Sequence, residues 1–115
     1  TKPIVLAGDS HAGWANRLRD GKGEIVGLEA GCTAISSPSY GSVLPGIGRL
    51  IEQTNPDTIY CNQDGKGYTL LTLRQQSATL EFVTVSTVMQ KNFDAEVDAS
   101  FEWKRSAAAP DWSRT

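Results

Sequence analysis

The sequence predicts a β-rich α+β fold with one main helix. Short apolar or alternating runs, rich in β-branched and aromatic residues, recur along the chain. Turn-forming residues such as Gly, Asn and Asp separate these runs, which is typical of strands joined by short connections. Apolar residues at helical spacing occur convincingly in one segment only. These three observations together favour a sheet-dominated domain.

The first half of the chain contains two expected strands. Ile4–Ala7 is a continuous apolar run that ends at Gly8, and this pattern predicts a strand buried on both faces. The turn sequence Asp20–Gly23 precedes a second expected strand at Glu24–Ala30. Small and hydroxylated residues then predict a loop over Gly31–Gly41.

The helix is expected in the middle of the chain and has about ten residues. Leucine and isoleucine recur there at helical spacing, at Leu44, Ile47, Leu50 and Ile51. Pro45 is tolerated in a first helical turn, whereas Pro56 disfavours helix at Asn55.

The second half is expected to be mostly strand. Thr58–Asn62 is followed by a turn at Asp64–Gly67, so Tyr68–Leu73 is predicted to be its antiparallel neighbour. A turn at Gln75–Ser77 then leads into a strand at Thr79–Val88.

The last expected strands carry a change of phase. Large apolar residues stand at even positions at Leu80 and Phe82 but at odd positions at Val83 and Val85, which predicts a β-bulge or a strand covered on both faces. Clean alternation predicts a half-buried strand over 99–104. We expect one domain over 1–105 and an irregular tail over 106–115.

Composition describes an ordinary globular segment. The 115 residues are 39% hydrophobic and 21% charged, with a formal charge of -2. Lys and Arg are scattered, so no nucleic-acid partner is expected. No apolar run reaches the ~20 residues of a membrane span, and no signal peptide is recognisable. The start at Thr1, without Met, favours a fragment that has lost upstream sequence.

Two cysteines, Cys32 and Cys61, are too far apart in sequence for a CxxC redox or zinc motif. Both fall in strand-like segments, which favours buried free thiols. A disulfide is the alternative, and spacing alone does not decide between the two.

The expected functional residues directly follow the first strand, at Asp9, Ser10 and His11. Gly8-Asp9-Ser10 resembles the opening block of the SGNH (GDSL-type) esterases, in which this serine is the nucleophile. A serine nucleophile needs a general base, normally a histidine. His11 is the one histidine of the chain and directly follows the serine, where the backbone normally points it elsewhere.

Asp9 and His11 offer a different chemistry, in which Ser10 is a spacer whose side chain faces away. In an extended chain, residues two apart project to the same side with Cα atoms roughly 6.5 Å apart. A carboxylate and a neutral imidazole so placed could each bind one ion of a two-metal site. The plain alternative is a turn in which Asp9 caps nearby amides and His11 packs at the surface.

Several segments in order carry a broader resemblance. Gly8-Asp9-Ser10-His11 with its continuation to Asn16, the strand and Ser-Pro loop from Glu24 to Pro38, and the Asn-Pro to Gly-Tyr stretch from Asn55 to Leu71 resemble the C-terminal part of the PhoD-like alkaline phosphatases and phosphodiesterases. These enzymes belong to the calcineurin-like metallophosphatase group. The similarity spans roughly residues 3 to 90.

This resemblance implies an αββα sandwich with a mixed sheet, of which the chain is the C-terminal part. It implies that Asp9 and His11 are metal ligands for iron and calcium, that the remaining ligands come from upstream motifs absent here, and that the substrate is a phosphate ester. It also implies a periplasmic or secreted protein. The isolated chain is then expected to be inactive, with an apolar face covered by the N-terminal part or by a second copy.

The neighbours of the motif have less specific expectations. Ser10, Trp14 and Asn16 are candidates for contacts behind the metal ligands or near the substrate, and Asn16 could equally cap a helix or turn. Trp14 and Tyr68 are expected to be packing residues rather than substrate contacts. A non-catalytic β-rich interaction module remains the alternative of a different class.

Overall fold

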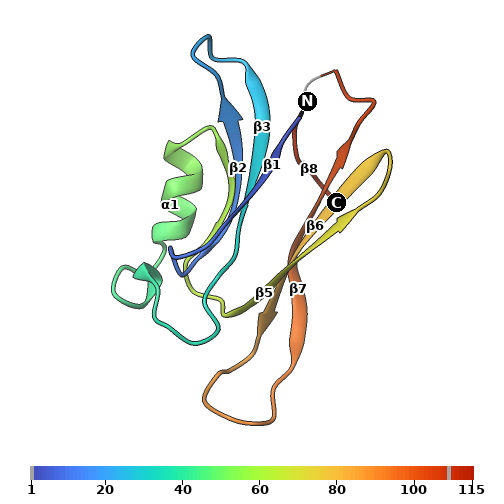
Figure 1. The fold of residues 1–115 in the computed structure, drawn as a ribbon. Helices are drawn as coiled ribbons and strands as arrows, with labels where there is room; N and C mark the ends of the chain where they lie inside the picture. The colour runs from blue at the N-terminus through green and yellow to red at the C-terminus, as the bar shows by residue number, and fades with distance from the viewer. Residues whose placement is uncertain (1, 109) are drawn as a thin grey trace.

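The computed structural model describes residues 2–108 and 110–115. Two four-stranded sheets pack face to face, and the helix α1 (Ile47–Thr54) lies on the outer side of the first sheet (Figure 1). The strands are β1 (Ile4–Ala7), β2 (Gly13–Arg19), β3 (Ile25–Gly31), β4 (Thr58–Asn62), β5 (Gly67–Leu73), β6 (Ser77–Val85), β7 (Ala95–Lys104) and β8 (Ser113–Arg114). A 3-10 turn, η1 (Tyr40–Ser42), precedes the helix. The β-rich α+β class is confirmed.

The first sheet has the order β1-β3-β2-β4 and is mixed, as expected. β1 runs parallel to β3, and the other neighbours are antiparallel. The strand β2 was not predicted, because Asn16, Arg17 and Arg19 interrupt its apolar residues. The two arginines are held by carboxylates: Arg17 Nε lies 2.8 Å from Asp111 Oδ1, and Arg19 Nε lies 2.8 Å from Asp57 Oδ1.

The prediction that Ile4–Ala7 is buried on both faces is wrong. β1 is an edge strand that pairs on one side only, with β3. Val5 is 44% exposed and Leu6 is 67% exposed. The apolar run therefore predicted the strand correctly. It did not correctly predict the burial of the strand, because nothing in the described chain covers its outer side.

The second sheet is antiparallel throughout, with the order β5-β6-β7-β8. The predicted pairing of Tyr68–Leu73 with Thr58–Asn62 is wrong, because β5 pairs with β6. A tight turn, in which Arg74 N donates to Ser77 O at 2.8 Å, brings β5 and β6 together over seven residue pairs. The turn after β4 instead carries the chain from one sheet to the other (Figure 1).

The phase slip in β6 corresponds to a real irregularity. The β6–β7 register passes from Phe82 opposite Ala99 to Val83 opposite Val97, which leaves Asp98 as an extra residue. This bulge directs Asp98 toward the first sheet, where Tyr60 Oη donates to its Oδ2 at 2.6 Å. The prediction of a β-bulge is confirmed.

The core lies between the two sheets. It combines small residues with three rings, and Tyr60, Phe82 and Phe101 contact one another with centroid separations of 4.3 to 6.1 Å. The segment 106–115, predicted to be irregular, contributes Trp112 to this core and forms the short strand β8 beside β7. The segment has one large apolar side chain, which is too few to form an alternating pattern, so no strand was predicted there.

The helix is shorter than predicted. It begins at Ile47 because Gly46 has a left-handed backbone with φ of 83°, so Pro45 lies in the turn before it. Gly48 faces β4 at close range: a Cβ there would lie 2.5 Å from Cys61 O. Among the described residues no helix has the length and apolar character needed to cross a membrane.

Both cysteines are free thiols. Cys61 is buried and Cys32 is half-buried, which agrees with the expectation of thiols without a disulfide. Burial raises the pKa of the Cys61 thiol, and the nearby carboxylate of Glu52 adds to this effect.

Candidate functional site

The loop between β1 and β2 has an unusual backbone. Asp9 has φ of 66° and His11 has φ of 57°, so both residues adopt the left-handed conformation. The chain is therefore not extended here, and the expectation of two side chains projecting in parallel from an extended segment is wrong. Asp and His tolerate this region better than most residues with a side chain, but the conformation still costs free energy.

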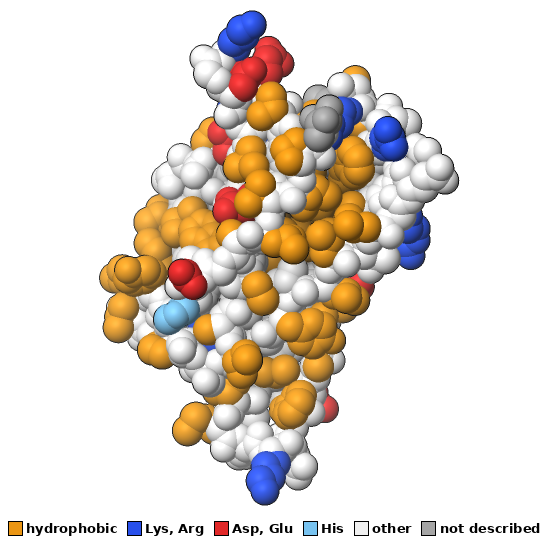
Figure 2. All heavy atoms as spheres, in the orientation of Figure 1, with side chains coloured by type: hydrophobic (Ala, Val, Ile, Leu, Met, Phe, Trp, Pro, Cys, Tyr) orange, Lys and Arg blue, Asp and Glu red, His pale blue; other side chains and the backbone are white. Residues whose placement is uncertain are grey.

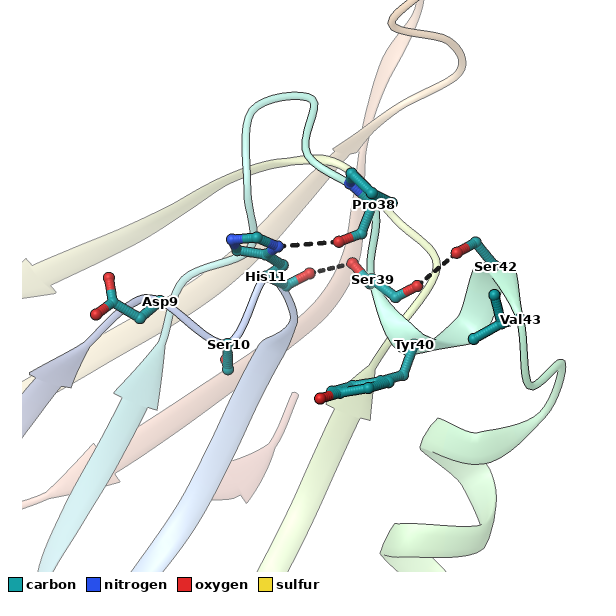
Figure 3. A pocket seen from close by; sticks show the side chains of 8 residues that line it. All are labelled: Asp9, Ser10, His11, Pro38, Ser39, Tyr40, Ser42 and Val43. Carbon is teal, nitrogen blue, oxygen red and sulfur yellow. Dashed lines mark hydrogen bonds between the residues drawn. The ribbon is translucent and has the colours of Figure 1, made fainter.

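His11 is held through its ring. Its Nδ1 lies 2.9 Å from Pro38 O, and Pro38 belongs to the loop that follows β3. A carbonyl oxygen only accepts, so Nδ1 carries a proton, and in the neutral ring this leaves the Nε2 lone pair free. In Figure 3 this second ring nitrogen points away from Pro38, toward the side on which the Asp9 carboxylate lies.

The His11 backbone is anchored by three further groups. Its carbonyl oxygen accepts hydrogen bonds from Ser39 Oγ, from Thr33 Oγ1 at 3.2 Å and from Lys66 Nζ at 3.4 Å. Lys66 Nζ also donates to Ser39 Oγ. Two loops distant in sequence, the loop after β3 and the turn after β4, therefore converge on His11 and fix the position of its imidazole.

Lys66 was missed as a site residue by the sequence analysis. It stands between two glycines in the turn after β4, a pattern that indicates only a turn. Partial burial lowers the pKa of its ammonium group, while the Asp64 carboxylate acts in the opposite direction. Its contact with the His11 carbonyl makes it part of the support of this loop.

Ser10 lies on the other side of the loop from the His11 ring (Figure 3). Trp14 Nε1 donates to Ser10 Oγ at 2.8 Å. Trp14 also packs over Gly31, where an added Cβ would lie 2.9 Å from the indole ring. The geometry agrees with Ser10 as a spacer and with Trp14 as a packing residue, and it places no imidazole where it could take the Ser10 proton.

Asn16 and Tyr68 are not brought to this loop. Asn16 lies within β2, and its Nδ2 donates to Glu29 Oε2 at 2.9 Å on the neighbouring strand. The interpretation of Asn16 as a helix or turn cap is therefore wrong. Tyr68 is 53% exposed on β5, so it contributes less packing than expected.

Asp9, Ser10 and His11 open onto a pocket of about 420 Å³. The other lining residues come from the loop after β3 and from η1, namely Pro38, Ser39, Tyr40, Ser42 and Val43. Figure 2 shows the histidine at the surface, beside an acidic side chain and next to a hydrophobic patch. The site is thus exposed and accessible to groups from outside this chain.

The donor chemistry fits part of a metal site. An exposed carboxylate and an imidazole with a free Nε2 suit hard and borderline cations, and a metal-binding histidine commonly donates its other ring N–H to a carbonyl. Within residues 2–108 and 110–115, however, no group of three or more His, Cys, Asp or Glu side chains could hold an ion. Two ligands alone do not complete a coordination sphere.

Comparison with known protein families identifies the family of this chain. The sequence model described as PhoD-like phosphatase matches residues 1–82. The chain belongs to the PhoD-like phosphatase family. No curated protein matches it.

The fold of this PhoD-like chain agrees with a solved structure. The structure titled "Structure of PhoD" superposes with a TM-score of 0.75 at 24% sequence identity, over 97% of this chain and 22% of that chain. At this identity the likeness shows the fold. The PhoD-like chain therefore spans about a fifth of the length of that protein.

Proposed function

We propose that this chain supplies Asp9 and His11 as a metal-ligand pair to a metal-dependent hydrolase of phosphate monoesters or diesters. The observation that supports this best is the 2.9 Å contact between His11 Nδ1 and Pro38 O. It selects the tautomer whose Nε2 can bind a cation and holds the ring in place. Membership of the PhoD-like phosphatase family supplies the reaction class.

The backbone of the loop gives independent support. Two left-handed residues with side chains, separated by one serine, are an uncommon arrangement. Strained backbone of this kind concentrates at functional sites, where the orientation of a side chain matters more than its conformational cost. Here the left-handed backbone makes the side chains of Asp9 and His11 point away from that of Ser10.

The cofactors of the proposal are two metal ions, iron and calcium, as the family resemblance implies. Bound ions of this kind supply Lewis-acid polarisation of the phosphoryl oxygens and activate water as the nucleophile. In this proposal Asp9 and His11 hold and orient the metal ions, and neither residue transfers a proton. The Ser39, Thr33 and Lys66 contacts keep the His11 backbone in position.

The remaining metal ligands are proposed to come from parts of the protein outside these residues, so that the 115-residue chain alone is inactive. Exposed apolar side chains near the site agree with a covering partner. Leu6 is 67% exposed, Tyr40 68% and Val43 72%. We propose that the rest of the phosphatase domain, or a second copy of this chain, covers them. An exported location is part of the same proposal.

The test uses the protein that contains the remainder of the domain. Asp9→Asn keeps side-chain size and His11→Asn keeps a polar side chain. Both tolerate the left-handed backbone but weaken metal binding. Metal content by elemental analysis and hydrolysis of p-nitrophenyl phosphate and bis-p-nitrophenyl phosphate should both fall by about a hundredfold or more, since each variant removes a direct ligand.

Ser10→Ala is the matched control, because it changes the residue between the two proposed ligands. It should leave metal content and hydrolysis within about twofold of the unmodified protein. Unchanged metal content in both Asn variants would overturn the ligand assignment. Loss of hydrolysis in Ser10→Ala with full metal content would favour the serine nucleophile instead.

A further inference from the structure

A second pocket, of about 590 Å³, lies away from the proposed metal site. It is lined by Lys2, Arg74, Gln75, Trp103 and Arg105. Lys2 precedes β1 and Asp9 follows it, so the two sites are separated by roughly 20 Å at the rise of a strand. They share no lining residue.

The backbone around this pocket is well fixed. Arg74 N donates to Ser77 O at 2.8 Å in the β5–β6 turn, and Arg105 N donates to Gln76 O at 2.9 Å, which ties the end of β7 to the same turn. Lys2 Nζ donates to Ala107 O at 3.1 Å. Three segments distant in sequence thus bring three cationic side chains together.

The charge of this pocket is not neutralised within the described chain. No acidic residue lines it, and Lys2, Arg74 and Arg105 form no ion pair with the described residues. Figure 2 shows basic side chains on the upper right of the molecule, at the end where the β5–β6 turn and the end of β7 lie in Figure 1.

Trp103 adds a second observation. Its Nε1 is buried and has no hydrogen-bond partner among residues 2–108 and 110–115. A buried donor without a partner costs free energy, and the Trp103 side chain also lines this pocket. At the pocket itself the Gln75 amide and the two guanidinium groups offer donors.

From these features we infer that this pocket binds the phosphate group of a ligand. A phosphate dianion matches a site with several cations and no carboxylate, and guanidinium groups bind its oxygens in pairs. The pocket volume leaves room for a group attached to the phosphate. The inference does not depend on Asp9 and His11 as metal ligands.

The test measures binding of two probes by calorimetry, inorganic phosphate and glycerol 3-phosphate, in EDTA so that no metal at Asp9 and His11 contributes. The double variant Arg74→Gln/Arg105→Gln should weaken both probes by about tenfold or more, because each guanidinium makes charge-assisted hydrogen bonds. Both side chains are exposed, so the fold should survive, and circular dichroism checks it.

The control removes two positive charges elsewhere, at the exposed Lys22 and Lys91, and should change affinity by less than about twofold. Equal weakening in both double variants, or absence of saturable binding in the unmodified protein, would overturn the inference. Tighter binding of glycerol 3-phosphate than of phosphate would show that the remaining volume of the pocket holds the attached group. Equal affinity for the two probes would show that the pocket contacts the phosphate group alone.

A third readout reports on Trp103 directly. The chain has three tryptophans and hence three indole N–H resonances, of which Trp103→Phe identifies one. Phosphate should shift the Trp103 resonance and leave those of Trp14 and Trp112 unchanged. A shift of the Trp14 resonance alone would place the phosphate near Ser10 instead and would contradict the inference.

Discussion

His11 Nδ1 lies 2.9 Å from the carbonyl oxygen of Pro38, a residue 27 positions further along the chain. The contact joins the loop after β1 to the loop after β3. Because those two strands are parallel neighbours, both loops leave the same edge of the sheet. The parallel pairing is therefore what makes this contact possible.

The His11–Pro38 contact predicts a single tautomer of the neutral ring. We expect the proton on Nδ1, because the carbonyl accepts there, and an unprotonated Nε2. Nitrogen-15 chemical shifts of the His11 ring in the metal-free protein at alkaline pH measure this directly, and the single histidine makes assignment simple. A dominant Nε2–H form would contradict both the contact and the proposed ligand role.

The left-handed backbone at Asp9 predicts opposite effects of two small substitutions. Asp9→Ala should destabilise the fold by about 1 kcal/mol relative to Asp9→Gly, because Ala bears the steric cost of positive φ and Gly does not. Free energies of unfolding in urea compare the two. The same pair at Gly8, which has no positive φ, is the control and should favour Ala. Equal stability of the two Asp9 variants would argue against the observed conformation.

Ser10→Ala tests the support of the loop. The substitution removes the acceptor of the Trp14 indole N–H, so the free energy of unfolding should fall by about 0.5 to 1.5 kcal/mol. The Trp14 fluorescence spectrum should change as its N–H loses this partner. A stability equal to that of the unmodified chain would show that solvent replaces the serine without cost.

Tyr60 predicts a loss of stability at alkaline pH. Burial, followed by the hydrogen bond to Asp98, raises the pKa of Tyr60 well above its ordinary value near 10. As pH rises, Tyr60 therefore ionises first in the unfolded chain. The stability contributed by the protonated Tyr60 is fully present below pH 10 and falls by about 1 kcal/mol per pH unit above it. Tyr60→Phe should flatten that decline between pH 9 and 11 in urea unfolding.

Two controls accompany the Tyr60 measurement. Tyr68→Phe removes a hydroxyl from an exposed position and should keep the alkaline decline. Cys61→Ala separates the contribution of the thiol, whose pKa is also raised by burial. A Tyr60→Phe curve parallel to that of the unmodified chain would contradict the prediction.

The segment 106–115 is predicted to be essential to stability. Trp112 is 4% exposed and packs in the core, so Trp112→Ala should cost about 3 kcal/mol or more. Asp111→Asn should cost less, about 1 kcal/mol, because the Arg17–Asp111 pair is partly exposed. Ser113→Ala, at an exposed position, is the control. Truncation after residue 105 without loss of stability would show that the tail is dispensable.

Local patterns predicted most strands in place. Thr58–Asn62 has the predicted bounds, Glu24–Ala30 differs from β3 by one residue at each end, and the phase slip at Phe82 and Val83 located the bulge. These features depend on residues close in sequence, such as alternation and turn signals. The strand β2 was missed because its polar residues find partners at Asp57, Asp111 and Glu29, which no local pattern reveals.

The candidate site, like the fold, could be predicted only in part from the sequence. The motif Gly8-Asp9-Ser10-His11 was recognisable because its residue types are few and chemically specific. The conformation of the loop was not, since two left-handed residues replace the expected extended chain. Pro38, Ser39 and Lys66 were also missed, because their contacts with His11 arise only when three loops meet.

The sequence by itself determined the fold class, the family and the identity of Asp9 and His11 as candidate ligands, because these follow from local periodicity and from an ordered set of motifs. The tertiary structure decided which strands are neighbours, which apolar residues are exposed and how His11 is held. Those properties depend on contacts between residues far apart in the chain, whose free energies no short stretch of sequence contains.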